Sequence, residues 1–189
     1  MKNINKILIS GEGGQGIQLI SKCLAVSAQL DGRNSVYLAN YGVEQRGGVS
    51  LGFIQISDEE IGFPKFQYAD IIIILTQRAI DRVKEYIKKD TIIIADETLV
   101  KNDSLKGTQD VIMIPALKLA SDNLVPRVFN TIILGALGAI LKIDSKSLKE
   151  SVQSELSEKY KKSPELKHFN ERALEIGRRT VLIEENIIG

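Results

Sequence analysis

The most constraining feature of this sequence is a glycine-rich segment between a strand-like run and a helical stretch. Residues 7–9 read Ile-Leu-Ile, residues 10–16 read Ser-Gly-Glu-Gly-Gly-Gln-Gly, and helical spacing begins at Ile17. A Gly-x-Gly-x-x-Gly spacing at a strand-to-helix turn lets the backbone turn tightly and approach a ligand, while N–H groups at the helix start face any anion. We therefore expect a nucleotide-binding type of strand–loop–helix unit near the start of the chain.

Strand-like and helical segments continue to alternate after this loop. Several strand-like segments are β-branched runs without polar alternation, which is typical of strands buried on both faces of a parallel sheet. The alternation predicts an α/β, doubly wound, mostly parallel sheet with helices on both faces. Strands are expected at 6–10, 35–40, 49–57, 70–76, 91–96 and 111–115, and helices at 17–30 and 78–89. Segment 49–57 alternates, so it need not run parallel to the others.

The last third of the sequence is expected to be helical. Helical spacing covers residues 127–142, 145–161 and 164–185, with Asp144 and Ser163 as plausible N-caps. Gly135 and Gly138 are unfavourable inside a helix, so they predict close approach to another backbone, within the chain or in a partner. No linker divides the chain, so we expect a single domain, 1–189, in which 1–115 form the sheet core and 116–189 pack on it or on partner subunits.

Composition argues against several classes of protein. The chain has 25 Lys and Arg against 24 Asp and Glu, a net charge of +1, so nucleic acid is not expected as a partner. Its one cysteine, Cys23, excludes an intrachain disulfide or a CxxC metal or iron–sulfur site, and is expected to be buried. The start of the sequence has no signal-peptide pattern, and the apolar run 128–141 is too short to span a bilayer. These features predict a soluble, cytoplasmic protein without membrane contact.

Classical NAD(P) binding requires more than the glycine loop. It needs an acidic residue at the end of the second strand to hold the ribose hydroxyls. Here that strand ends at Asn40, Asp31 precedes it and Glu44 lies well past it. The sequence therefore disfavours a conventional dinucleotide site.

A second unusual loop, residues 40–50, stands where that acid would be. Arg46 offers a permanent charge and a planar donor fork for phosphate or carboxylate, and Gly47 and Gly48 allow a ligand to contact the backbone. In a parallel sheet both glycine loops leave the same edge, so we expect them to face each other across the carboxyl ends of adjacent strands. The alternative is that Arg46 pairs with Glu44 or Glu12 and the glycines only make a turn.

No catalytic set accompanies these loops. His168, the only histidine, lies far along the sequence and is expected on a solvated helix surface. No Gly-x-Ser-x-Gly motif occurs, and Asp96 with Glu97 alone is poor evidence for a metal. We expect no catalytic residue and no metal ligand in this chain, which on chemistry alone would not carry out a reaction unaided.

Five segments, taken together, carry a family resemblance. They are Gly-Glu-Gly-Gly-Gln-Gly at 11–16, Tyr-Gly-Val-Glu-Gln-Arg-Gly-Gly at 41–48, Ile-Ser-Asp-Glu-Glu-Ile at 56–61 followed by Pro64, Ala-Asp at 69–70, and Asn-Thr-Ile-Ile-Leu-Gly-Ala-Leu at 130–137. Over most of the chain this set resembles the gamma subunit of 2-oxoacid:acceptor (ferredoxin) oxidoreductases. The 2-oxoglutarate branch is most similar, because Tyr-Gly precedes the Arg-Gly-Gly and Ser-Asp-Glu follows the next strand.

The resemblance implies a Rossmann-like, non-catalytic subunit of a complex that oxidatively decarboxylates a 2-oxoacid with coenzyme A, giving an acyl-CoA (succinyl-CoA from 2-oxoglutarate) and a reduced ferredoxin-type acceptor. Thiamine diphosphate, Mg and iron–sulfur clusters would belong to other subunits. The residues implied to border coenzyme A or to contact other subunits are Gly11, Gly13, Gly14, Gln15, Gly16, Tyr41, Glu44, Arg46, Gly47 and Gly48.

Partners implied by the resemblance are alpha and beta subunits, in some complexes a ferredoxin-like delta subunit, and ferredoxin or flavodoxin as the acceptor. The isolated chain is expected to be inactive and able to form homodimers through partner-facing surface. Alternatives that stay open are a subunit of a pyruvate, branched-chain oxoacid or indolepyruvate oxidoreductase, and a free-standing NAD(P)-binding protein.

Overall fold

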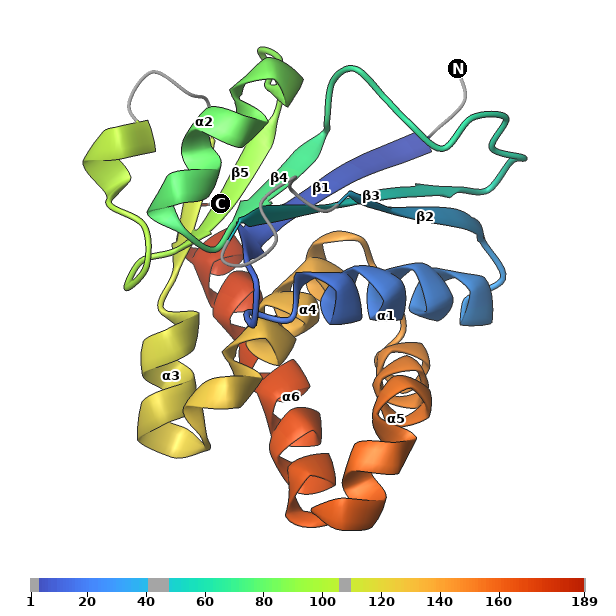
Figure 1. Cartoon of the computed structure of the whole chain (residues 1–189), viewed down its shortest axis with the longest axis vertical. Coiled ribbons are helices and arrows are strands. Elements are labelled where there is room, and N and C mark those ends of the chain that lie inside the picture. The colour runs from blue at the N-terminus through green and yellow to red at the C-terminus, as the bar shows by residue number, and fades with distance from the viewer. Residues whose placement is uncertain (1–3, 41–47, 106–109, 189) are drawn as a thin grey trace.

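A computed structural model of the chain describes residues 4–40, 48–105 and 110–188, with the side chains of 183–188 excepted. Its centre is a six-stranded sheet in the order β2-β3-β1-β4-β5-β6 (Figure 1). The strands are β1 (Ile4–Glu12), β2 (Asn34–Asn40), β3 (Val49–Ser57), β4 (Ile71–Ile74), β5 (Ile92–Asp96) and β6 (Val111–Ile114). All six predicted strands are confirmed, although β1 is longer and β4 is shorter than predicted.

One strand of the sheet runs against the other five. β1, β4, β5 and β6 pair in parallel, whereas β3 pairs antiparallel with both β1 and β2. Because β3 lies between them, β1 and β2 point the same way but are not neighbours. The expectation that the two glycine loops follow adjacent strands is therefore wrong, while the prediction of a mostly parallel sheet is confirmed.

Helices follow the predicted pattern except at two places. The helices are α1 (Ile17–Leu30), α2 (Ile80–Val83), α3 (Ala116–Asn123), α4 (Phe129–Ile140), α5 (Ser145–Lys162) and α6 (Glu165–Ile188). Asp144 caps α5 as predicted, since its side chain accepts a hydrogen bond from the Lys146 N–H at 2.8 Å. α3 was not predicted.

The helix predicted at 78–89 is instead three short pieces. α2 lies between two 3₁₀ turns, η1 (Gln77–Ala79) and η2 (Lys84–Tyr86). The Ala69 N–H donates to the Tyr86 carbonyl at 2.8 Å, and Ile87 adopts an extended conformation. A tertiary hydrogen bond thus takes a carbonyl that a longer helix would have used internally.

The sheet is covered on both faces, as predicted, but unequally. α1, α4, α5 and α6 lie on one face, and the short η1–α2–η2 segment lies on the other (Figure 1). Along β4, Ile71 and Ile73 pack into the hydrophobic cluster on the face covered by α1, α4, α5 and α6. Ile72 and Ile74 pack into the cluster on the opposite face, beneath the η1–α2–η2 segment. This is why β4 reads as an unbroken apolar run: every side chain is buried on one face or the other.

Contact between α4 and α6 depends on glycines. A Cβ at Gly135 would lie 2.2 Å from the Leu174 carbonyl oxygen, and a Cβ at Gly177 would lie 1.8 Å from the Ile132 carbonyl oxygen. Any side chain at these positions would force the helices apart. The close backbone approach predicted from Gly135 therefore occurs within the chain.

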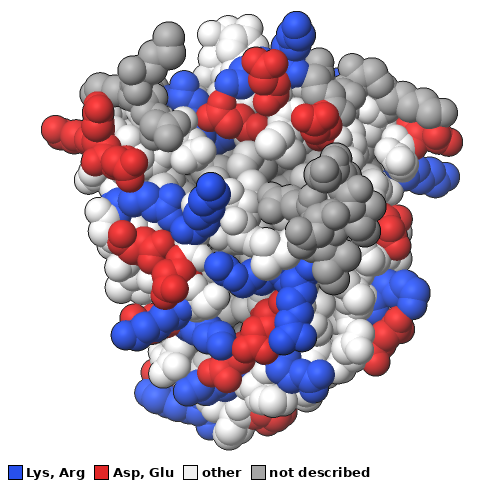
Figure 2. All heavy atoms as spheres, turned by 180° about the vertical axis from the view of Figure 1, so that it is seen from behind, with Lys and Arg blue, Asp and Glu red and all other residues white. Residues whose placement is uncertain are grey.

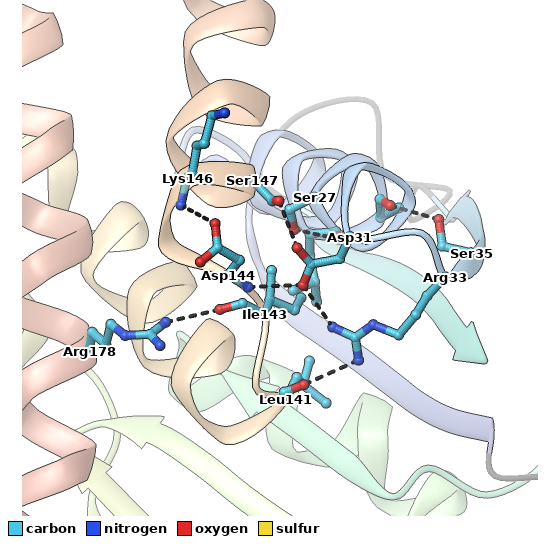
Figure 3. A network of polar contacts seen from close by, with 12 residues as sticks. Ser27, Asp31, Arg33, Ser35, Leu141, Ile143, Asp144, Lys146, Ser147 and Arg178 are labelled. Carbon is cyan, nitrogen blue, oxygen red and sulfur yellow. Dashed lines mark hydrogen bonds and ion pairs between the residues drawn. The ribbon is translucent and has the colours of Figure 1, made fainter. Parts of the chain in front are cut away.

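A polar network joins the end of α1 to the turn between α4 and α5 (Figure 3). The Asp31 carboxylate accepts hydrogen bonds from the Ser147 hydroxyl at 2.7 Å and the Asp144 N–H at 2.9 Å. Arg33 pairs with Asp31 at 3.4 Å and donates to the Leu141 carbonyl at 3.2 Å. Asp31 thus links the end of α1 that lies away from the glycine loop to the start of α5.

The surface charge, the buried cysteine and the helices can be compared with the expectations drawn from composition. On the face shown in Figure 2, Lys and Arg side chains alternate with Asp and Glu side chains over the part that the structure describes. Cys23 is buried as predicted, and burial raises the pKa of its thiol to about 12. None of the helices in the described ranges combines the length and the apolar composition that a membrane-spanning helix requires.

Candidate functional site

The two glycine loops begin at the same edge of the sheet. β1 ends at Glu12, which lies opposite Val49 of β3, and Gly48 immediately precedes Val49. β2 ends at Asn40, opposite Leu51 of the same strand. The shared edge predicted from the sequence is therefore present, with the start of β3 rather than an adjacent parallel strand beside the first loop. Of the second loop, Tyr41, Glu44, Arg46 and Gly47 lie outside the described residues.

The first loop needs glycine at two positions for its backbone shape. Gly14 has φ 94° and Gly16 has φ 76°, in the left-handed region that side chains disfavour. The Gln15 N–H donates to the Glu12 carbonyl at 3.2 Å, which closes the turn. Gly13 and Gly14 form its exposed tip, and a Cβ at either would meet no atom within 4 Å. The tip is open to a ligand or a partner.

Gln15 joins the base of the loop to the end of β1 and to Leu75, which follows β4. Its side-chain oxygen accepts a hydrogen bond from the Glu12 N–H at 2.7 Å, and its side-chain nitrogen donates to the Leu75 carbonyl at 2.8 Å. A Cβ at Gly11 would lie 2.5 Å from that side-chain oxygen, so Gly11 makes room for Gln15. These two residues, predicted as site residues, shape the loop from inside.

Asn130 lies on α4 and contacts the loop; the sequence assigned it no role beyond its place in the resemblance. Its Nδ2 donates to the Gln15 carbonyl at 3.0 Å, and its side chain is buried. A Cβ at Gly16 would lie 2.0 Å from the same nitrogen. The available signal was an asparagine in an apolar run, because a buried amide requires a polar partner.

Among the residues that the structure describes, Glu12 and Arg78 form an ion pair beside the first loop. Arg78 Nη1 lies 3.4 Å from Glu12 Oε1, and the Thr76 hydroxyl donates to the same oxygen at 3.2 Å. The Arg78 side chain is 58% exposed, so its ion pair with Glu12 is open to water and to competing anions. Arg78 was not among the predicted site residues; its position in η1, shortly after the end of β4, was the available signal.

Other candidate groups are engaged elsewhere. The Asp96 carboxylate is fully buried and accepts hydrogen bonds from the N–H groups of Thr98, Leu99 and Leu117. His168 is exposed on α6. No group of three His, Cys, Asp or Glu residues that could hold a metal occurs in the described part of the chain. At this edge the Arg78 guanidinium supplies a positive charge beside the exposed tip, and the Glu12 carboxylate is engaged with Arg78 and Thr76.

Comparison with known proteins gives a consistent result. Residues 6–180 match the pyruvate ferredoxin/flavodoxin oxidoreductase family. The chain is similar to the 2-oxoglutarate synthase subunit KorC of Methanocaldococcus jannaschii, with 38% identity over 89% of this chain and 90% of that protein.

Solved structures share the fold. The gamma subunit of a keto/oxoacid ferredoxin oxidoreductase from Geobacter sulfurreducens aligns over 96% of this chain and 98% of its own, with a TM-score of 0.80 and 26% identity. A 2-oxoglutarate:ferredoxin oxidoreductase chain from Magnetococcus marinus aligns with a TM-score of 0.85 and 23% identity, covering 97% of this chain but 32% of that one. The resemblance to gamma subunits is thereby confirmed, and the chain belongs to the pyruvate ferredoxin/flavodoxin oxidoreductase family.

Proposed function

We propose that this chain is the non-catalytic gamma subunit of a 2-oxoglutarate:acceptor oxidoreductase. The complex would oxidatively decarboxylate 2-oxoglutarate with coenzyme A, giving succinyl-CoA and a reduced ferredoxin-type acceptor. The observation that carries this proposal is the open tip of the first glycine loop, Gly13 and Gly14, at the edge where the second loop also begins. The 38% identity to a 2-oxoglutarate synthase subunit supports the choice of substrate.

The chain's own residues fit a supporting role in binding coenzyme A. The M. marinus structure is described as having 2-oxoglutarate, coenzyme A and succinyl-CoA bound. Coenzyme A carries phosphates, and backbone N–H groups of a glycine loop together with an arginine are suited to bind them. In this chain Gly13, Gly14 and Arg78 would supply such groups, together with Arg46 from the second loop. The loops would bind and orient the cofactor and would not carry out proton transfer.

Thiamine diphosphate, Mg and iron–sulfur clusters would lie in other subunits. With one buried cysteine in the whole sequence, the chain cannot supply the thiolates of a cluster. We therefore propose alpha and beta subunits as partners, with a ferredoxin-like delta subunit where the complex has one, and ferredoxin or flavodoxin as acceptor.

Pyruvate is the second candidate substrate, because the matching family is described as pyruvate ferredoxin/flavodoxin oxidoreductase. Branched-chain oxoacids and indolepyruvate are further candidate substrates, and the assay of acceptor reduction described below compares all of them. We infer that a free-standing NAD(P)-binding protein is disfavoured, since the described part of β2 ends in Asn40 and Asp31 is engaged with Ser147.

The proposed function is tested with the complex reconstituted from this chain and its co-expressed partners. Initial rates of acceptor reduction with 2-oxoglutarate, pyruvate, 2-oxoisovalerate and indolepyruvate should favour 2-oxoglutarate in kcat/KM. Preference for another oxoacid would reject that substrate, and activity that does not require this chain would reject the subunit assignment.

A substitution at the loop tip tests the binding role. Gly13→Ala adds a methyl group where nothing lies within 4 Å and where φ is not positive, so the free chain should fold normally. If coenzyme A approaches this backbone, the variant complex should show a raised KM for coenzyme A with little change in kcat. Gly62→Ala is the matched control, because Gly62 is an exposed glycine with equally open surroundings. Equal KM values in both variants would place coenzyme A elsewhere.

A further inference from the structure

We propose that Asn130 is a positioning residue that presets the glycine loop for coenzyme A by linking it to α6 through a buried chain of polar side chains. The inference rests on the proposed function for its ligand and on the geometry of the described residues for its mechanism. Asn130 would not touch the ligand itself. It would act through the backbone of Gln15 and Gly16.

The contact between Asn130 and the loop is closely fitted. The Asn130 Nδ2 donates to the Gln15 carbonyl at 3.0 Å across 115 residues of sequence, and it leaves no space for a Cβ at Gly16. Gly16 is also the N-cap of α1, in a left-handed conformation, and its carbonyl accepts the first hydrogen bond of that helix from Ile20 at 3.1 Å. One amide group therefore holds the peptide that joins the loop to α1.

Asn130 is in turn held by two further buried polar residues. The Thr131 hydroxyl carries one hydrogen, which it shares between Asn170 Oδ1 at 2.7 Å and Asn130 Oδ1 at 3.3 Å. Asn170 Nδ2 donates to the Leu166 carbonyl in the first turns of α6 at 2.9 Å. All three side chains are at least 94% buried, with exposures of 6% for Asn130, 2% for Thr131 and 4% for Asn170. A continuous chain thus runs from the loop through α4 to α6.

Three polar side chains buried in a mainly hydrophobic core need an explanation. Burying an amide is unfavourable unless its hydrogen-bonding groups have partners, and a satisfied buried network specifies one arrangement. Here the arrangement specified is the position of the Gln15 carbonyl. Gln15 fixes the other side of the loop to Glu12 and Leu75, so the exposed tip between Glu12 and Gln15 is held at both ends.

A tip held in this way lowers the entropy that is lost when a ligand binds to it. Loosening the loop should therefore weaken the binding of coenzyme A while leaving the chemical step, carried out by other subunits, almost unchanged. This separates a positioning role from a general role in stability, which would lower the amount of folded complex without changing KM.

The test uses Asn130→Ala in the reconstituted complex, with Ser151→Ala as a matched control. Ser151 on α5 is also fully buried, and its hydroxyl donates to the Leu148 carbonyl at 2.9 Å, away from the loop. In Asn130→Ala we expect amide hydrogen exchange at residues 13–18 to rise about tenfold and the KM for coenzyme A to rise, with kcat within about twofold of the wild type. Ser151→Ala should change neither the amide hydrogen exchange at residues 13–18 nor the KM for coenzyme A.

Asn130→Asp provides a second variant of nearly equal size. It replaces the donor with an oxygen that faces the Gln15 carbonyl oxygen, so the loop should exchange still faster. If Asn130→Ala does not assemble, Asn130→Ser takes its place. The serine side chain keeps a polar group in the core, but its hydroxyl ends one bond short of the position of the asparagine Nδ2 and so does not reach the Gln15 carbonyl in the same way.

The outcomes separate this inference from the proposed function. Loop exchange that is no faster in the Asn130 variants than in Ser151→Ala overturns the positioning role, whatever Gly13→Ala shows. Faster exchange without a rise in KM for coenzyme A overturns positioning for that ligand. If Gly13→Ala also leaves this KM unchanged, the loop is not a coenzyme A contact and the binding part of the proposed function fails as well.

Discussion

The Cα of Gly177 on α6 lies so close to Ile132 on α4 that a Cβ at position 177 would come within 1.8 Å of the Ile132 carbonyl oxygen. Because the obstacle is helix backbone, it cannot rotate away as a flexible side chain could. Gly177→Ala should therefore lower the free energy of unfolding by about 1–3 kcal/mol, measured by urea denaturation of the isolated chain. Gly62→Ala should stay within about 0.5 kcal/mol of the wild type; a similar loss in both variants would argue against this tight contact.

Asp31 should make the stability of the chain sensitive to acid. Burial raises the pKa of its carboxyl, but hydrogen bonds from Ser147 and Asp144 and the nearby Arg33 outweigh burial, so the net pKa is lowered. A lowered folded-state pKa contributes stability that is present above the unfolded value, about 3.9, and lost as pH falls through the folded value. In urea denaturation from pH 7 to pH 3, the stability difference between wild type and Asp31→Asn should shrink below about pH 4.

A control for the acid experiment is Asp122→Asn, which removes an exposed carboxylate paired with Lys118 on α3. Exposed pairs of this kind contribute little to stability. This variant should follow the wild-type pH profile, and an Asp31→Asn profile parallel to it would contradict the role assigned to Asp31.

Cys23 should be inert in the folded chain. Its thiol is fully buried, and burial, with a smaller contribution from Glu155, raises its pKa to about 12. The raised pKa keeps the thiolate, which is the reacting form, at very low abundance at pH 8. Iodoacetamide at pH 8 should label the native chain at least about 100-fold more slowly than the urea-unfolded chain. Rapid labelling without denaturant, followed by mass spectrometry, would show instead that the thiol is accessible.

Arg46→Ala tests the second glycine loop. An arginine beside Gly47 and Gly48 is suited to bind a phosphate or a carboxylate, so its loss should raise the KM for coenzyme A or reduce assembly with partner subunits. Steady-state kinetics and size-exclusion chromatography of the co-expressed complex distinguish the two effects. Arg82→Ala, at an exposed site on α2, is the control. Unchanged kinetics and assembly in Arg46→Ala would leave Arg46 with only a local role in its turn.

The purified chain alone should neither reduce an acceptor with a 2-oxoacid nor bind NAD or NADP tightly. The Glu12 carboxylate at the loop edge is engaged with Arg78 and Thr76, and β2 ends in Asn40 where a ribose-binding acid would stand. Isothermal titration with NAD, NADP, AMP and coenzyme A, combined with an oxoacid-dependent dye-reduction assay, checks both statements. Turnover by the isolated chain, or tight NAD binding, would contradict the subunit assignment.

Local sequence patterns predicted the parts of the fold whose signals are local. The helix from Ile17 to Leu30 and all six strands follow from periodicity, β-branched runs and glycine placement. The edge that carries both loops also follows, because each loop comes directly after a strand that points the same way. Such patterns could not predict where β3 lies in the sheet. Alternation along a strand indicates that its two faces have different surroundings, but it does not indicate which strands pair with it.

The candidate site also combines features that the local sequence determined with features that depend on tertiary packing. The sequence by itself determined that Gly13 and Gly14 form a turn between a strand and a helix, because glycine spacing encodes backbone conformation directly. Only the tertiary structure decided that β3 separates β1 from β2, that Arg78 meets Glu12, and that Asn130 holds Gln15. The physical reason is that a buried amide or an exposed charge requires a partner, but which partner it meets depends on the packing of elements far apart in the chain.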